Sequence, residues 1–296
     1  MRRSPRHLPP ITLLPTWLIL GAFLLAPLAI MLVISFARRG DHGGIAPIEH
    51  FAQYISTGAF LQNYKESTDP VYLAIFWQSL WMAVVTTILC LIVSYPMAYY
   101  IALVARRQRK NLLLALVAVP FWTSFLIRTY AWVLILRTEG LLNTALLHLH
   151  LIREPLQLLP SHFAIMLGLV YGELPFMILP LYASLEKLDR MLLEASNDLG
   201  AGGWGTFWRV TVPLTMPGIL AGVVLVFIPS LGQFIVSDML GGGKKVLIGN
   251  VIQDQFTTAR NPPLGSALAF ELTAIVLVLL MGYAFYTQRG KREVML

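Results

Sequence analysis

The chain has 296 residues, of which 57% are hydrophobic and only 12% carry a charge, whereas an ordinary soluble domain carries roughly 25% charged residues. This composition excludes an ordinary soluble domain and indicates a membrane protein. The net charge of +7 does not indicate nucleic-acid binding, because the Lys and Arg residues stand in short runs between apolar blocks, as they do at the ends of membrane spans. With Cys90 as the single cysteine, an intrachain disulfide and a cysteine zinc cluster are both excluded.

Six apolar segments are long enough to cross a bilayer as helices, which takes about 20 residues each. The first apolar run is much longer than the roughly 7 to 15 residues of a signal peptide, so it is interpreted as an uncleaved span. The sequence therefore predicts an all-α integral membrane protein with a single transmembrane domain over residues 1–296. Its six predicted spans are 11–37, 76–105, 112–136, 163–185, 214–236 and 267–287.

The Lys and Arg residues are distributed unevenly between the two sides of the membrane. Thirteen lie in the termini and loops of one side and eight in the loops of the other, and the loop RRQRK (106–110) is the most basic short connection. Because such loops stay in the cytoplasm, both termini are predicted to be cytoplasmic. The outer connections are long, and the pattern LLNTALLHLHL (141–151) predicts a short surface helix. The largest predicted cytoplasmic loop is 186–213.

Loop 186–213 contains three glycines in the GxGxxG spacing of a dinucleotide-binding turn, Gly200, Gly202 and Gly205. That function requires a strand before the first glycine. Apolar residues instead recur at helical spacing, at Leu188, Leu192, Ala195 and Leu199, so Gly200 is predicted to end a helix. The run GGGKKV (241–246) lacks the Ser or Thr of a phosphate-binding loop. We therefore expect that the chain does not hydrolyse ATP itself.

A different spacing in this loop fits a known signature. Glu194, Ala195 and Ser196 are followed by Gly200 and then by VTVP (210–213). This resembles the EAA motif of permease subunits of ABC importers, with Ser196 in place of the second alanine. Further blocks resemble the spermidine/putrescine branch, and the resemblance covers nearly all of the chain from about Leu61. These blocks are PFWTSFLIRTYAW (120–132), EGLLN (139–143), LPFMILPLYASLEKLD (174–189), VPLTMPGILAG (212–222) and SDMLGGGKKVLIGNVIQDQF (237–256).

The resemblance implies a type I ABC importer permease fold in the bacterial inner membrane. It implies four kinds of partner: a second homologous or identical permease subunit, an ATPase dimer, a periplasmic substrate-binding protein and membrane lipid. No cofactor is expected on this chain, since ATP and Mg would be bound by the ATPase subunits. The residues expected to couple to the ATPase are Glu194, Ala195, Ser196, Asp198, Gly200, Trp204 and Phe207.

A polyamine that leaves water needs carboxylates and aromatic faces along its route. The candidates for this pathway are Glu173, Gln233, Asp238, Tyr130, Trp132, Tyr171 and Glu271. An alternative role for Glu173 is to pair with Arg128 of the third span. The family often has an acid where Gln233 stands, so another small cation, an opine or an amino-acid derivative remains an alternative cargo.

Two other classes of function fit the sequence less well. An ion-coupled secondary transporter is expected to show internal repeats, and none is evident between residues 1–148 and 149–296. An intramembrane enzyme needs a nucleophile with a base, and no histidine lies inside a predicted span. Because His148 and His150 are two residues apart, they do not share one helical face, and no metal site is expected.

Overall fold

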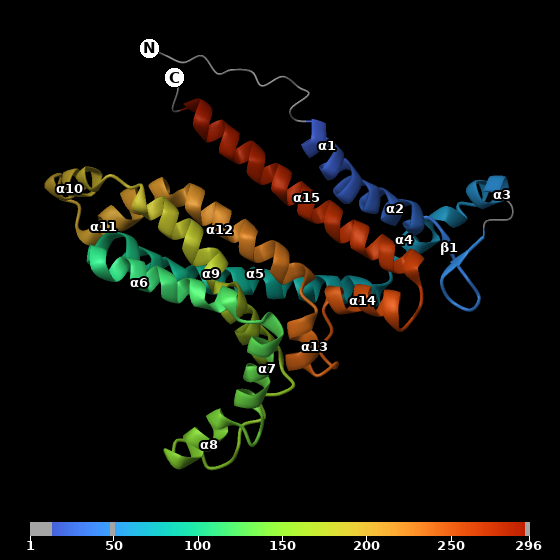
Figure 1. Cartoon of the computed structure of the whole chain (residues 1–296), viewed down its shortest axis with the longest axis horizontal. Coiled ribbons are helices and arrows are strands. Elements are labelled where there is room, and N and C mark those ends of the chain that lie inside the picture. The colour runs from blue at the N-terminus through green and yellow to red at the C-terminus, as the bar shows by residue number, and fades with distance from the viewer. Residues whose placement is uncertain (1–13, 48–50, 294–296) are drawn as a thin grey trace. The chain divides into compact units, whose positions relative to one another are not determined.

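The computed structural model describes residues 14–47 and 51–293, and helices account for most of them (Figure 1). Two short strands, β1 (Arg38–Arg39) and β2 (Ile45–Ala46), pair antiparallel. The chain forms two compact units, one made of Met1–Pro70 with Ile252–Ile275 and the other of Val71–Val251 with Val276–Leu296. The long helix α15 (Pro262–Glu293) contributes to both units.

In the described part of the chain, five helices are long and apolar enough to cross a membrane, and a sixth span is present if one sharply bent pair is counted as a single crossing. Predicted spans one, two, four and six fall on four of these helices. The predicted start of the first span, residues 11–13, lies outside the described residues. The five helices are Pro15–Ser35, Pro70–Val104, His162–Glu186, Gly203–Gly232 and Pro262–Ala284.

In the first unit, one apolar helix is followed by a more polar segment of short elements. The helix consists of α1 (Leu14–Leu20), a π-helical turn η2 (Gly21–Leu25) and α2 (Ala26–Ser35), and most of its large side chains are exposed, as expected of a helix that faces lipid. Three short helices follow the hairpin of β1 and β2: α3 (Phe51–Ser56), η3 (Ala59–Leu61) and α4 (Gln62–Ser67).

Buried side chains of α4 hold this segment in place. The amide of Asn63 donates to the carbonyl oxygens of Ser35 (2.8 Å) and Ala37 (2.9 Å). The Ser67 hydroxyl donates to the Glu271 carboxylate at 2.6 Å, so this acid of α15 has a partner within the first unit. The two Asn63 bonds satisfy carbonyl groups at and just after the end of α2 that the helix itself leaves free.

The second unit is built around α5 (Pro70–Tyr99), α9 (His162–Glu186) and α12 (Val212–Gly232), and α9 lies along α12 (Figure 1). Their shared core includes Cys90, Met177 and Leu181, all fully buried. Glycine permits the close approach, because a Cβ at Gly218 would lie 2.8 Å from the Pro180 carbonyl oxygen. A π-helical turn, η4 (Tyr100–Val104), continues α5.

The third predicted span is not one straight helix. It consists of α6 (Arg107–Ala118), a 3-10 turn η5 (Val119–Trp122) and α7 (Phe125–Leu136). The helical segment Arg107–Trp122 is bent by 92° from the segment Phe125–His148 that follows it. Pro120 has no backbone N–H for the helix, and Thr123 is extended with its N–H bonded to the Pro120 carbonyl. The predicted continuous span 112–136 is therefore wrong at residues 123–124.

The fifth predicted span also ends earlier than expected. Helix α12 stops at Gly232, and Gln233 has an extended conformation, with ψ at 126°. The chain then turns into α13 (Ile235–Gly241) and α14 (Ile248–Thr257). Gly249 contacts the end of α12 so closely that a Cβ there would lie 2.5 Å from the Gly232 carbonyl oxygen. The predicted end at residue 236 missed this break because residues 234–236 are apolar.

The short helix predicted within 141–151 is present as α8 (Leu141–His148), and its place on the outer side of the membrane stays a prediction. Asn143, which is 1% exposed, fixes its position: the side-chain amide donates to the carbonyls of Arg137, Thr138 and Leu156 and accepts from the Leu156 N–H. His150 lies beyond the end of this helix. In the described residues, no group of three or more His, Cys, Asp and Glu side chains is arranged to hold a metal ion.

Candidate functional site

The segment before Gly200 is a helix, as the sequence predicts. Helix α10 (Arg190–Asp198) begins at Asp189, whose carboxylate accepts from the Met191 N–H at 3.0 Å. It ends before Gly200, which has a φ of +84°, a left-handed conformation that favours glycine. Because a helix precedes the glycines, the GxGxxG spacing here is not a dinucleotide-binding turn.

Helix α10 projects from the second unit with an uncovered surface. None of its residues is buried. Met191 is 68% exposed, and Leu199, the residue after the helix, is 90% exposed. The predicted coupling residues Glu194, Ala195, Asp198 and Gly200 are exposed too, and Ser196 is half-buried. Apolar side chains at such exposure indicate a surface that a partner covers.

The segment after the glycines is continuous with the fifth predicted span. Helix α11 (Gly203–Thr206) runs through a π-helical turn, η6 (Phe207–Thr211), directly into α12. Pro213 lacks an N–H for a regular helical bond, and the π-helical turn just before it carries the helix through. The loop is therefore a hairpin of α10 and the extended start of the fifth span.

The aromatic residues of this hairpin divide into two groups. Trp204 and Trp208 are 75% and 54% exposed. Phe207, by contrast, packs inward, with ring centroids 5.3 Å from Tyr95 and 6.3 Å from Tyr99 of α5. Phe207 is stacked on Trp204 at 5.8 Å. The two tryptophans are thus available to a partner, whereas Phe207 anchors them to the core.

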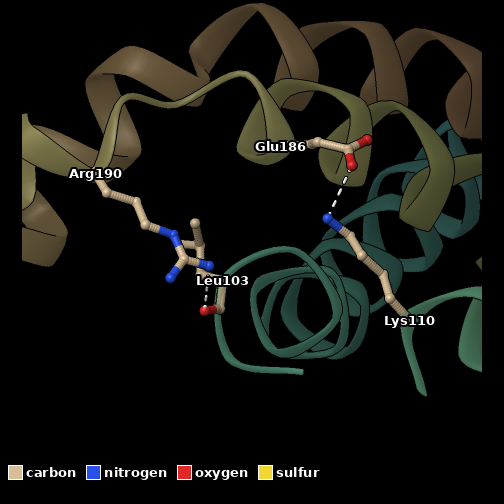
Figure 2. A network of polar contacts seen from close by, with 4 residues as sticks. All are labelled: Leu103, Lys110, Glu186 and Arg190. Carbon is tan, nitrogen blue, oxygen red and sulfur yellow. Dashed lines mark hydrogen bonds and ion pairs between the residues drawn. The ribbon is translucent and has the colours of Figure 1, made fainter. Parts of the chain in front are cut away.

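Two polar contacts join the helix ends near α10 (Figure 2). The Lys110 ammonium group forms an ion pair with the Glu186 carboxylate at 2.8 Å, which links the start of α6 to the end of α9. The Arg190 guanidinium donates to the Leu103 carbonyl oxygen at 3.0 Å, which links the start of α10 to η4. Both contacts involve residues in or next to the predicted basic loop 106–110, since Lys110 belongs to it and Leu103 lies just before it.

Asn197 and Thr206, which join α10 to α11, were not among the residues predicted from the sequence. The Thr206 hydroxyl donates to the Asn197 side-chain oxygen at 3.1 Å, and Ser196 Oγ lies 3.0 Å from Thr206 Oγ1. Thr206 is only 6% exposed. The signal available in the sequence was a small hydroxyl residue, Thr206, between Gly205 and the aromatic residues Phe207 and Trp208. Such a residue suits a buried polar contact.

Glu173 lies at the centre of α9 and is 5% exposed. Its Oε2 atom has no hydrogen-bond partner, and neither does the buried Nε atom of Arg128 on α7. Among the described residues, the ion pair formed is that of Lys110 with Glu186, so Glu173 and Arg128 do not form a direct ion pair. Because an ionised group inside a span is costly, Glu173 stays a candidate for the transport pathway.

The other candidates for the pathway lie in several places. Trp132 of α7 contacts Tyr171 of α9 edge to face at 5.5 Å, so these two aromatic residues are brought together. Tyr130 is 54% exposed, and Asp238 is exposed on α13. The Gln233 side-chain oxygen accepts from the Ile235 N–H at 3.3 Å.

Comparison with known proteins identifies the family. The family described as binding-protein-dependent transport system inner membrane component matches residues 94–289. The chain belongs to this family and is a membrane-spanning permease subunit of an ABC importer, not an enzyme.

Named relatives support this assignment. The chain is 43% identical over 269 residues to the spermidine/putrescine transport system permease protein PotB of Haemophilus influenzae, which covers 90% of this chain and 89% of the relative. It is 36% identical over 250 residues to the inner membrane ABC transporter permease protein YdcU of Escherichia coli, which covers 80% and 78% of the two chains. Both relatives are bacterial permeases, in agreement with an inner-membrane location.

A solved structure shows the same fold. The crystal structure of a bacterial ABC transporter that imports the acidic polysaccharide alginate contains a chain that matches with a TM-score of 0.67. The match covers 94% of each chain, at 17% sequence identity. The predicted type I importer permease fold is confirmed by this match and by the family.

Proposed function

We propose that this chain forms half of the translocation pathway of an ATP-driven importer for polyamines such as spermidine and putrescine. The observation that carries the proposal is the 43% identity over 90% of the chain to spermidine/putrescine permeases. Sequence similarity at this level extends over the spans as well as the coupling loop, so it bears on the cargo as well as on the energy source.

The exposed face of the hairpin supports coupling of this chain to a separate ATPase. Met191, Leu199 and Trp204 present apolar surface on the predicted cytoplasmic side, where a groove on an ATPase dimer would cover them, as in other helix-in-groove contacts. ATP and Mg would bind to that dimer. A second permease subunit would complete the pathway and a periplasmic binding protein would deliver the cargo.

A buried acid and a pair of aromatic residues support a cationic cargo. Glu173 keeps an unpartnered carboxylate oxygen inside the second unit, and Trp132 and Tyr171 lie on the same two helices, α7 and α9. A carboxylate together with aromatic faces suits an ammonium group that has lost its water. Arg128 offsets part of the charge, which would let the site release its cargo.

The coupling role is tested with Gly200→Pro and Glu194→Lys in the reconstituted importer. Proline fixes φ near −65°, so it conflicts with the φ of +84° at Gly200, and the lysine reverses the charge on the exposed face of α10. Both variants are expected to reach the membrane and to lose cargo-stimulated ATP hydrolysis. Gly202→Ala is the matched control, because a Cβ there meets no atom within 4 Å. Wild-type hydrolysis and uptake in both loop variants would contradict the assigned role.

A further inference from the structure

Packing alone does not fix helix α10. It has no buried residue, and a cleft of about 610 Å³ opens beside its first turn. This cleft is lined by Asp189 and Leu192 on the α10 side and by Leu214 and Pro217 on the α12 side. A helix that is expected to transmit movement to the spans therefore needs other contacts to hold it.

Two sets of polar contacts supply them, one at each end of α10. At the start, the Arg190 guanidinium reaches the Leu103 carbonyl oxygen at 3.0 Å (Figure 2). At the end, the side chains of Ser196, Asn197 and Thr206 form a cluster that we call the hydroxyl clasp. Thr206 contributes to it from α11, across the glycine turn.

The hydrogen atoms in the clasp can be assigned from its chemistry. A hydroxyl has one hydrogen to donate, and Thr206 donates its own to the Asn197 oxygen at 3.1 Å. The Ser196 hydroxyl must then be the donor to Thr206 Oγ1, at 3.0 Å. Two bonds thus converge on one buried oxygen, and their directions fix the relative positions of α10 and α11.

The helix behind the clasp is anchored in turn to the core. Thr211 Oγ1 makes a long, 3.5 Å contact with the Thr206 carbonyl oxygen, and Thr215 Oγ1 donates to the Thr211 carbonyl at 2.8 Å. Tyr95 of α5 completes the series with a 2.8 Å bond to Thr215 Oγ1. Thr206 lies five residues before Thr211, which is the spacing of bonded residues in a π-helical turn such as η6. Thr206, Thr211 and Thr215 are all buried.

We propose that the hydroxyl clasp fixes the coupling helix α10 to α11. Ser196, Asn197 and Thr206 are then positioning residues that make α10 move together with α12. This inference rests on the proposed coupling role of the loop and adds to it a specific device. Ser196 occupies the place of the second alanine of the EAA motif, so this chain has a hydroxyl where an alanine would offer none. Without the clasp, α10 would still bind a partner but would swing on the Gly200 turn, and ATP hydrolysis would no longer be matched by cargo movement.

Thr206→Val and Thr206→Ser form a matched pair for the test. Valine keeps the shape of threonine and removes the hydroxyl, whereas serine keeps the hydroxyl. The variants are studied in the complete importer, reconstituted with its ATPase dimer, second permease and binding protein. The readout is the coupling ratio, the number of spermidine molecules taken up per ATP hydrolysed, because this ratio is independent of how much complex is active.

We expect Thr206→Val to lower the coupling ratio about tenfold, as for the loss of two polar contacts, with normal co-purification of the ATPase. Thr206→Ser is expected to stay within about twofold of wild type, because it retains both bonds. Ser196→Ala removes only one bond from a half-buried position and is expected to lower the ratio about threefold. Thr257→Val, at an exposed threonine of α14, is the control and should match wild type.

The outcomes separate this inference from the proposed function. If the wild-type complex shows no cargo-stimulated ATP hydrolysis, the proposed function fails and the clasp inference fails with it. If the wild type couples normally and both Thr206→Val and Ser196→Ala keep its coupling ratio, the clasp inference alone is overturned. Should Thr206→Val fail to assemble, Ser196→Ala decides, since its side chain is not part of the buried core.

Discussion

At the scale of single residues, local patterns were predictable and tertiary contacts were not. The helix end at Gly200 followed from apolar spacing and a glycine, and the structure confirms it with a φ of +84°. The relation of Glu173 to Arg128 depends on how α7 packs against α9, which one sequence does not contain. The same is true of Gly249, whose need for glycine arises from the backbone of Gly232, 17 residues earlier.

Gly249 gives a stability prediction at this scale. A Cβ at position 249 would lie 2.5 Å from the Gly232 carbonyl oxygen and 3.1 Å from its carbon. Because these neighbours are backbone atoms, they move only with the whole turn, and we expect Gly249→Ala to destabilise the protein by about 1 to 3 kcal/mol. Thermal unfolding of the purified permease measures this. Gly282→Ala, where a Cβ meets nothing within 4 Å, should unfold at the wild-type temperature or slightly above, and equal losses in both variants would contradict the packing argument.

Glu173 gives a prediction about the cargo. If its carboxylate faces a polyamine on the pathway, Glu173→Gln removes one charge contact, and the KM of spermidine uptake should rise about tenfold without a change in melting temperature. If Glu173 serves only to balance Arg128, the variant changes the melting temperature and leaves the KM unaltered. Glu154→Gln, an exposed acid of a predicted outer loop, is the control for charge loss alone.

At the scale of elements, the long apolar helices were predictable and their interruptions were less so. Hydrophobic length located spans one, two, four and six, because burial in lipid demands a continuous apolar helix. It could not reveal the 92° bend after Trp122, since prolines are tolerated in spans and Pro120 alone does not require a break. Nor did it predict that α11 would continue into α12, because a π-helical turn has no clear sequence signal.

The exposed end of α10 gives a prediction about assembly. Leu199 is 90% exposed, and if an ATPase groove covers it, Leu199→Glu places a charge in an apolar contact. We expect the affinity for the ATPase dimer to fall about tenfold, measured by titration of the purified permease pair with the ATPase. Gln108→Glu adds the same charge to an exposed position of α6 and should bind normally. Equal affinities for all three proteins would place the ATPase contact elsewhere.

At the scale of the whole molecule, the family and the fold follow from sequence and agree with the structural match. Orientation across the membrane stays a prediction from the positive-inside rule. Cys90 makes it simple to test, because this single cysteine is fully buried and buried thiols are inert to polar reagents.

Arg107→Cys and Thr138→Cys place exposed thiols on the predicted inner and outer sides. A maleimide that does not cross membranes should label Thr138→Cys in intact spheroplasts and Arg107→Cys only after permeabilisation. The wild type should remain unlabelled in both conditions. The opposite pattern would reverse the orientation and move loop 186–213 to the periplasmic side, out of reach of an ATPase.

The account as a whole depends on ATP-driven polyamine movement through a pathway that includes this chain. The most direct measurement is uptake of labelled spermidine into proteoliposomes that contain the complete importer, its binding protein outside and ATP enclosed. We expect uptake that requires enclosed ATP, is competed by putrescine and is not competed by amino acids or opines. Uptake that persists without ATP, or an importer that moves an opine and leaves spermidine outside, would contradict it.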